Sequence, residues 1–316
     1  MGCDFPFPVP WRKIPENIYF TVRFIYGILT RPDFKDTNKQ LQAYGIPKAA
    51  ALPRPDIPWI SQNMLEASIP LEVVPPNVTS AGPIVLDTEP AAQQDPELAA
   101  WLARAPTVLV NLGSLFTYSE EQATAMAQAI QDLLSGTEVQ VLWKMAKDST
   151  YSDTYALPLR SYIDEGRLRI VDWLTIDPVA LLETGHIVAS VHHGGANCYH
   201  EAIAYVITSS STEIMYPLTF RSAGIPQVII PLWLDLYNYA QLAEDIGVGV
   251  YATRGTAPQW TVEGLRDSFL RAVDGGEESL RMRKKAKELG DIAQREPGRY
   301  VAARVIAQLA ESGYAW

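Results

Sequence analysis

The stretch HIVASVHHGGANCYHEA, residues His186–Ala202, decides the fold of this chain. Its first part, His186–Val191, is an apolar run typical of a buried parallel strand. A glycine pair and a polar segment with helical character follow, and all four histidines of the chain lie between His186 and His200. A strand that passes through Gly-Gly into a helix lets backbone N–H groups approach an anion closely. The pattern therefore predicts a phosphate site.

Three side chains of this stretch favour a nucleotide ligand. His193 can donate a hydrogen bond to a pyrophosphate, and Asn197 can cap the helix or bind phosphate. Glu201 lies four residues after Asn197 and so on the same helix face, where a carboxylate suits the hydroxyls of a ribose. A glycine turn without function remains an alternative at this point. A zinc site of His192, His193 and His200 is disfavoured, because adjacent strand residues point to opposite faces and no cysteine pair lies nearby.

Strands and helices alternate along the rest of the chain from Thr107 onward. A helix is predicted to begin at Ser119, where Gln122 completes a capping box, and to end at Gly136. The alternation predicts an α/β fold with a doubly wound parallel sheet, whose ligands bind at the carboxyl ends of the strands. The predicted strands are Thr107–Ser114 (a strand together with its terminal Gly-Ser turn), Val139–Met145, Leu168–Trp173, His186–Val191, Gln227–Trp233 and Val248–Tyr251. The other predicted helices are Pro96–Ala103, Pro178–Glu183, Tyr237–Asp245 and three stretches up to Ala315.

Composition restricts the class of protein and its surroundings. The formal net charge of -10, with no dense basic run, argues against a nucleic-acid partner. Two cysteines, Cys3 and Cys198, form no disulfide framework, and no signal peptide is visible, so we expect a cytoplasmic protein. The apolar segment Asn17–Leu29 is interrupted by Arg23 and too short to span a membrane. It predicts a packed amphipathic helix, with peripheral contact to a membrane as the alternative.

Two further motifs flank the histidine-glycine stretch. Trp173-Leu174 lies upstream, and GIPQVIIPLWLD, Gly224–Asp235, lies downstream. This combination resembles the donor-binding signature of the UDP-dependent glycosyltransferases, the family 1 enzymes of the GT-B fold. It is most similar to members from filamentous fungi. NLGS, Asn111–Ser114, resembles the first phosphate loop of the same domain.

The resemblance implies a role for each matching residue. Trp173 would stack on uracil, Glu201 would bind the ribose, and Asp235 would bind sugar hydroxyls. Ser114, His193, Gly195 and Asn197 would hold the diphosphate. The whole implied donor-binding set is Ser114, Trp173, His193, Gly194, Gly195, Asn197, Cys198, Glu201 and Asp235. No metal and no cofactor beyond the UDP-sugar co-substrate is implied. Trp173 as a core tryptophan and Asp235 as a helix N-cap remain alternatives.

The sequence departs from the family pattern at several positions. Cys198 stands where the family has Ser or Thr, so one hydroxyl contact to phosphate is lost. Leu236 replaces a frequent Gln, so the sugar is not identified. Tyr205–Ser222 interrupts the join of the motif helix to AGIPQ. We interpret these residues as a retained intron or gene-model artefact, which sequencing of the spliced transcript would refute if the mature message encodes them.

The expected domain organisation follows from the same resemblance. Residues 1–83 are interpreted as a remnant of the N-terminal acceptor domain, shortened at its start, and 84–106 as a linker. Residues 107–296 form the UDP-sugar donor domain, and 297–316 a C-terminal helix that packs back toward the N-terminal part. The family's general base is a histidine near the N-terminus, but no histidine precedes His186, so no catalytic residue is assigned.

These observations favour an inverting glycosyltransferase. It would move a sugar from a UDP-sugar to a hydroxyl of a small lipophilic acceptor, such as a secondary metabolite or sterol-like compound. The alternative is a non-catalytic nucleotide-sugar-binding module, or the donor half of a split enzyme whose acceptor domain is a separate chain. A Rossmann NAD-binding protein is disfavoured, because no G-x-G-x-x-G follows a strand with an acidic residue downstream.

Overall fold

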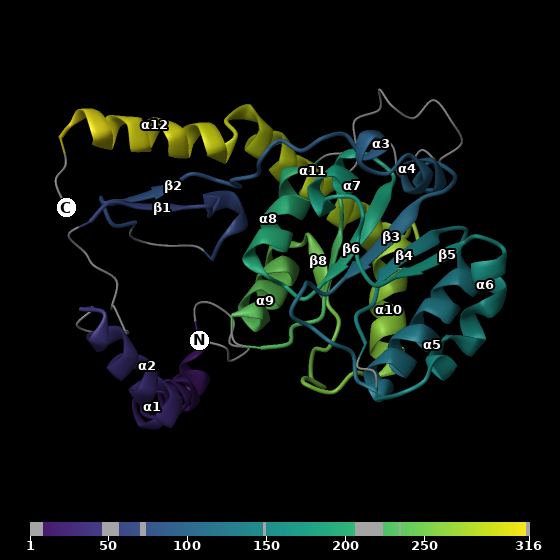
Figure 1. The fold of residues 1–316 in the computed structure, drawn as a ribbon, viewed down its shortest axis with the longest axis horizontal. Helices are drawn as coiled ribbons and strands as arrows, with labels where there is room; N and C mark the ends of the chain where they lie inside the picture. Colours follow the sequence, from purple (N-terminus) through teal and green to yellow (C-terminus); the bar gives the residue numbers. More distant parts are fainter. Residues whose placement is uncertain are drawn as a thin grey trace.

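A computed structural model describes residues 9–45, 57–69, 74–147, 150–205, 224–233 and 235–313. The interruption that we interpret as an insert, Tyr205–Ser222, lies outside these residues except for Tyr205. The described part contains a large α/β body and a smaller N-terminal portion (Figure 1).

The α/β body is built on a six-stranded sheet in which every neighbouring pair is parallel, in the order β5-β4-β3-β6-β7-β8. The strands are β3 (Thr107–Asn111), β4 (Gln140–Lys144), β5 (Leu168–Val171), β6 (Ile187–His192), β7 (Gln227–Ile229) and β8 (Gly249–Tyr251). The chain winds outward from β3 to one edge and then from β6 to the other. The predicted doubly wound parallel sheet is thereby confirmed.

The order of the strands fixes where a ligand can bind. β3 and β6 are neighbours, and the chain continues from each of them toward opposite edges of the sheet. Asn111 pairs with His192 at the carboxyl ends of these two strands. The loops that leave these two ends therefore diverge and leave a crevice between them. Both phosphate-loop candidates of the sequence, NLGS and HHGGAN, emerge at this point.

Helices cover both faces of the sheet (Figure 1). Alternate residues of β3 divide between the two faces, with Val108 and Val110 on one side and Leu109 on the other. The first side packs against α5 (Glu120–Gly136) and α10 (Val262–Val273). The second packs against α4 (Pro96–Leu102), α7 (Pro178–Glu183), α8 (Ala196–Ala204), α9 (Leu236–Ile246) and α11 (Glu277–Arg295). The capping box of Ser119 and Gln122 at the start of α5 is present as predicted.

Two strands end at least two residues earlier than predicted, β5 at Val171 rather than Trp173 and β7 at Ile229 rather than Trp233. β3 ends at Asn111, and the turn expected at the end of Thr107–Ser114 follows it. The chain turns out of the sheet at these points, as at Gly113, whose φ of 86° no strand accommodates. The residues beyond the strand ends are thus free to line a pocket.

The N-terminal portion contains two helices, α1 (Ile14–Thr30) and α2 (Pro32–Ala43), although its sequence is rich in proline. Pro15 and Pro32 stand in the first turns, where a missing N–H costs no helical hydrogen bond. The prediction that Asn17–Leu29 is a packed helix is wrong for the described chain, because most of its apolar side chains are exposed. The exposed set includes Ile18, Tyr19, Val22, Ile25, Tyr26 and Leu29. No described helix is both long and apolar enough to cross a membrane.

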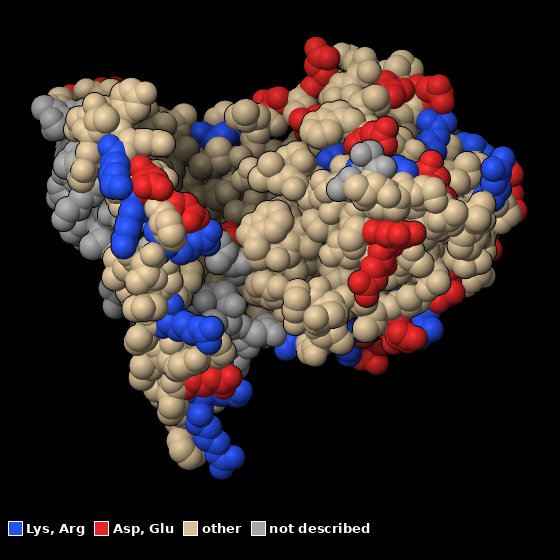
Figure 2. Space-filling model, turned by 60° about the horizontal axis from the view of Figure 1, so that its bottom comes forward, with Lys and Arg blue, Asp and Glu red and all other residues tan. Residues whose placement is uncertain are grey.

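Other elements come from the chain segments before β3 and after α11. β1 (Trp59–Ser61) and β2 (Val78–Ser80) form a separate two-stranded parallel sheet. The interpreted linker contains α3 (Ala91–Gln94) and α4, and three residues of α4 are buried. α12 (Gly298–Glu311) begins against the segment before α3, where Arg299 donates to the carbonyl of Val85 at 3.2 Å. Acidic and basic side chains are interspersed on the face in Figure 2, without one continuous basic field.

Candidate donor-binding site

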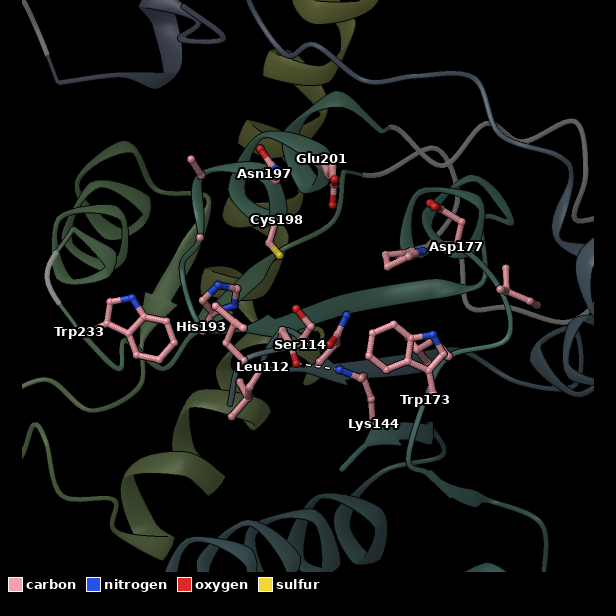
Figure 3. Close-up of a pocket in the computed structure, with 18 residues that line it drawn as sticks. Leu112, Ser114, Lys144, Trp173, Asp177, His193, Asn197, Cys198, Glu201 and Trp233 are labelled. Atoms are coloured by element: carbon pink, nitrogen blue, oxygen red, sulfur yellow. Dashed lines mark hydrogen bonds between the residues drawn. The ribbon is translucent and has the colours of Figure 1, made fainter. Parts of the chain in front are cut away.

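A cavity of about 640 Å³ opens at the carboxyl ends of the central strands (Figure 3). Seven of the nine predicted donor-binding residues line it: Ser114, Trp173, His193, Gly195, Asn197, Cys198 and Glu201. They come from three separate loops and one helix, which only the sheet brings together. Gly194 and Asp235 are not among the lining residues.

The loop after β3 is shaped by Asn111 and Gly113. The Asn111 Oδ1 accepts a hydrogen bond from the Gly113 N–H at 3.1 Å, which closes a short turn. Gly113 adopts a φ of 86°, so the position favours glycine. The turn leaves Ser114 exposed at the mouth of the cavity, with its hydroxyl available to a ligand.

The loop after β6 brings the N-terminus of α8 to the opposite wall. Gly194 adopts a φ of 87°, and a Cβ there would lie 2.8 Å from Ile229 Cγ2 and 3.0 Å from the Leu236 carbonyl oxygen. Gly195 is the N-cap of α8, and no side chain caps the helix. The first N–H groups of α8 therefore remain available to an anion, and the helix dipole favours one.

The His193 imidazole lies between the two phosphate loops. A Cβ added to Gly113 would meet the ring at 3.1 Å, and one added to Gly195 would meet Nε2 at 2.5 Å. Burial lowers the pKa of His193, with Asp235 acting in the opposite direction and Lys144 in the same one. The free protein therefore holds a neutral imidazole at neutral pH. The His193 Nδ1 is buried without a hydrogen-bond partner.

His192 is a core residue and not a ligand-binding one. Its Nδ1 accepts from the Gly194 N–H at 3.1 Å, so its Nε2 carries the proton and donates to Gln227 at 2.9 Å. Burial lowers its pKa to about 3. Both ring nitrogens are engaged, which leaves none for the zinc ion considered from the sequence. Among the described residues no cluster of three or more potential metal-ligating side chains occurs.

Trp173 lies two residues beyond β5 and is 65% exposed, so the alternative of a core tryptophan is wrong. Its ring is accessible in the cavity wall and offers a flat surface for a base. Lys144, the last residue of β4, places its Nζ 4.5 Å from the centre of this ring. The same Nζ donates to the Gly113 carbonyl at 2.7 Å, so the lysine links the tryptophan to the loop after β3.

Three α8 residues line the cavity with polar or weakly polar side chains: Asn197, Cys198 and Glu201. Burial, with a smaller contribution from Asp177, raises the pKa of Glu201. Burial also raises the pKa of Cys198 to about 12, so its thiol stays protonated at neutral pH. Asn197 accepts a hydrogen bond from Gln62 at 3.1 Å, which connects α8 to the segment after β1.

Asp235 lines a second, smaller hollow of about 340 Å³ together with His200 and Tyr239. It occupies the N-cap position of α9, but its side chain makes no capping hydrogen bond. Its effect on the pKa of His193 shows that the two groups interact electrostatically. A role toward the sugar therefore stays a prediction.

Sequence reasoning missed three residues that line the donor cavity: Lys144, Asp177 and Trp233. Trp233 lies near His193, with ring centres 6.2 Å apart. Each of the three lies at or beyond a strand end or at a helix start. Position at the carboxyl edge of a parallel sheet was the signal that could have identified them.

The sequence is similar to curated glycosyltransferases. Glycosyltransferase sdnJ of Sordaria araneosa is 34% identical over 337 aligned positions, which cover 98% of this chain and 61% of that protein. Sterol 3-beta-glucosyltransferase of Komagataella phaffii is 27% identical over 280 positions, which cover 81% of this chain and 19% of that protein. No family model matches the sequence.

Solved structures share the fold at low identity. A UDP-glucosyltransferase from Polygonum tinctorium capable of glucosylating indoxyl has a TM-score of 0.59 at 18% identity, covering 79% of this chain and 52% of that one. Phytolacca americana UGT2, complexed with UDP-2fluoro-glucose and pterostilbene, has a TM-score of 0.56 at 19% identity, with the same coverage.

The doubly wound parallel sheet, with a cavity at the carboxyl ends of its central strands, shares its fold with these solved GT-B enzymes. The chain belongs to the glycosyltransferases, as its motifs indicated, and within them its fold is that of the UDP-glycosyltransferases of the GT-B type. The chain spans 61% of the length of the Sordaria araneosa relative and 52% of the two solved structures.

Proposed function

We propose that this protein binds a UDP-sugar and transfers the sugar, with inversion, to a hydroxyl of a small lipophilic acceptor. The observation that carries the donor assignment is the single cavity shared by the Ser114 loop, the N-terminus of α8 and Trp173. The acceptor class is supported by relatives named sterol 3-beta-glucosyltransferase and by a solved neighbour complexed with pterostilbene. We propose further that the reaction takes place in the cytoplasm and belongs to secondary metabolism.

Each part of the donor has a chemically suitable partner. Uracil stacks on Trp173, the ribose hydroxyls donate to Glu201, and the diphosphate accepts from Ser114 and the first N–H groups of α8. UDP-sugar is the co-substrate, and no resident cofactor is proposed. The acceptor oxygen attacks the anomeric carbon opposite the diphosphate, and the electron pair of the broken C–O bond leaves with UDP. The hydroxyl proton passes to a base that we assign to no described residue.

Trp173→Ala should weaken UDP binding about tenfold to thirtyfold, because stacking of a base on an aromatic side chain contributes about 1–3 kcal/mol and the middle of this range corresponds to that factor. Calorimetric titration of the folded protein with UDP, in EDTA, measures this loss. Trp11→Ala is the matched control, because Trp11 is 74% exposed in the N-terminal portion and absent from the cavity wall. Equal UDP affinity of both variants and the native protein would contradict the donor assignment.

A second candidate is a nucleotide-sugar-binding module, or a donor half whose acceptor domain is a separate chain. It is favoured by the positions of three of the four histidines. His192 is engaged in the core, His193 lies in the donor cavity, and His200 uses its Nδ1 to donate to the Ala196 carbonyl at 2.6 Å. UDP binding without consumption of UDP-sugar, across a panel of lipophilic hydroxyl compounds, would favour this candidate over the transferase.

A further inference from the structure

Lys144 occupies the junction between the aromatic platform and the loop after β3 (Figure 3). Its Nζ lies 4.5 Å from the centre of the Trp173 ring and 2.7 Å from the Gly113 carbonyl oxygen. The residue is only 6% exposed, yet it lines the donor cavity. One of its three N–H groups is used by Gly113, and the other two remain for a ligand.

The charges around the cavity make this lysine distinctive. Among the described residues that line the cavity, Lys144 is the only Lys or Arg, whereas Asp177 and Glu201 contribute two carboxylates. A diphosphate brings further negative charge into a site that is partly shielded from water, where an uncompensated anion is costly. The neutral His193 and the α8 N-terminus supply hydrogen bonds and a partial charge. In the free protein, where His193 is neutral, a full positive charge in this described wall comes from Lys144 alone.

We propose that Lys144 is a diphosphate-binding residue, whose ammonium contacts the phosphate nearest the nucleoside. This inference rests on the proposed UDP-sugar function, since it takes uracil on Trp173 and the diphosphate at Ser114 and α8 as the two ends of the ligand. A nucleotide that extends from Trp173 to Ser114 and the N-terminus of α8 would pass close to the Lys144 Nζ. Burial lowers the pKa of Lys144, as expected for a cation held in a site whose anionic partner is a ligand.

The cation also suits the chemistry of sugar transfer. Negative charge grows on the departing diphosphate as its bond to the anomeric carbon lengthens. A fixed ammonium at the adjoining phosphate, the one nearest the nucleoside, stabilises this charge across the diphosphate, more in the transition state than in the bound donor. Lys144 therefore contributes both to UDP affinity and to the departure of UDP.

The test compares UDP with uridine, which keeps the base and ribose but lacks phosphate. Lys144→Met keeps the length of the side chain and removes the charge, and we expect UDP binding to weaken about tenfold to thirtyfold, as for loss of a charged hydrogen bond. Uridine binding should change less than about threefold. Lys147→Met is the matched control, because Lys147 pairs with Asp153 at 2.5 Å and does not line the cavity. Thermal unfolding of each variant checks that it is folded.

Each outcome supports or overturns the inference. A loss confined to UDP in Lys144→Met supports a contact with the diphosphate. An equal loss for UDP and uridine overturns it, because Lys144 would then act by positioning Trp173. Unchanged UDP binding overturns it as well. A native protein that binds neither UDP nor uridine overturns the proposed function itself, which separates that failure from failure of the lysine assignment.

Discussion

Gly194→Ala should lower the free energy of unfolding by about 3 kcal/mol, and equilibrium denaturation followed by circular dichroism should show it. Two effects add. The φ of 87° is strained for any residue with a Cβ, at a cost of about 1 kcal/mol. The new Cβ would also lie 2.8 Å from Ile229 Cγ2 and 3.0 Å from the Leu236 carbonyl oxygen, and such overpacking costs about 1–3 kcal/mol.

The surroundings of Gly194 make relaxation difficult. Ile229 is the last residue of β7, and the Leu236 carbonyl belongs to the first turn of α9, so relief requires a shift of a strand or a helix. Gly136→Ala is the matched control, since nothing lies within 4 Å of a Cβ there and its φ is not in the left-handed region. Loss of equal size in both variants, or no loss in Gly194→Ala, would refute this account of the turn.

The fold was predictable from sequence because its signals are local. Apolar β-branched runs alternate with helical segments, and the Ser119–Gln122 capping box indicates the residue at which α5 begins. The strand ends were less predictable. Leu112 and Leu174 are apolar and buried, so they extend the pattern of a strand even though the chain has left the sheet. Burial in a loop under a pocket and burial in a strand give the same sequence signal.

The sequence predicted the residues of the site only where a recognisable motif also lies at the carboxyl edge of the sheet. His193, Gly195 and Glu201 lie in one continuous stretch, so their proximity follows from one strand and one helix. Lys144 comes from a different strand, and only the pairing of β3 with β4 brings it beside Gly113. No motif includes this lysine. Asp235 shows the converse: the family resemblance implies that it binds sugar hydroxyls, whereas the structure places it at a separate hollow.

The exposed face of α1 illustrates a different limit. Its apolar periodicity correctly indicates a helix, because spacing is a property of the segment itself. What the apolar face contacts is a property of the rest of the fold. Within the described chain its only neighbours with extensive contacts are α2 and the short helix η1 (Trp11–Lys13) that precedes it. Periodicity alone therefore cannot distinguish a packed face from an exposed one.

His193→Ala should weaken UDP binding about hundredfold, the largest effect on affinity that we expect from a single side chain. The imidazole lies between Gly113 and Gly195, and so between the two loops that we propose hold the diphosphate. A hydrogen bond to a charged group contributes about 1.5–3 kcal/mol, and the upper part of this range corresponds to about a hundredfold change in affinity. Titration calorimetry with UDP measures the loss, and His193→Gln, which keeps an N–H donor, should recover part of it.

The dependence of this loss on pH separates a direct contact from a packing role. Burial lowers the pKa of His193, so the free protein carries a neutral imidazole at neutral pH, while Asp235 favours and Lys144 opposes the charged form. A bound diphosphate favours the imidazolium, so binding takes up a proton and strengthens as the pH falls toward and below the usual histidine range. The difference between native protein and His193→Ala should therefore widen from about pH 8 to pH 6, because protonation of UDP itself affects both equally. A difference that stays constant over this range would show that His193 is not protonated on binding, and recovery of affinity in His193→Gln then separates a neutral N–H donor from a role in holding Gly113 and Gly195 apart.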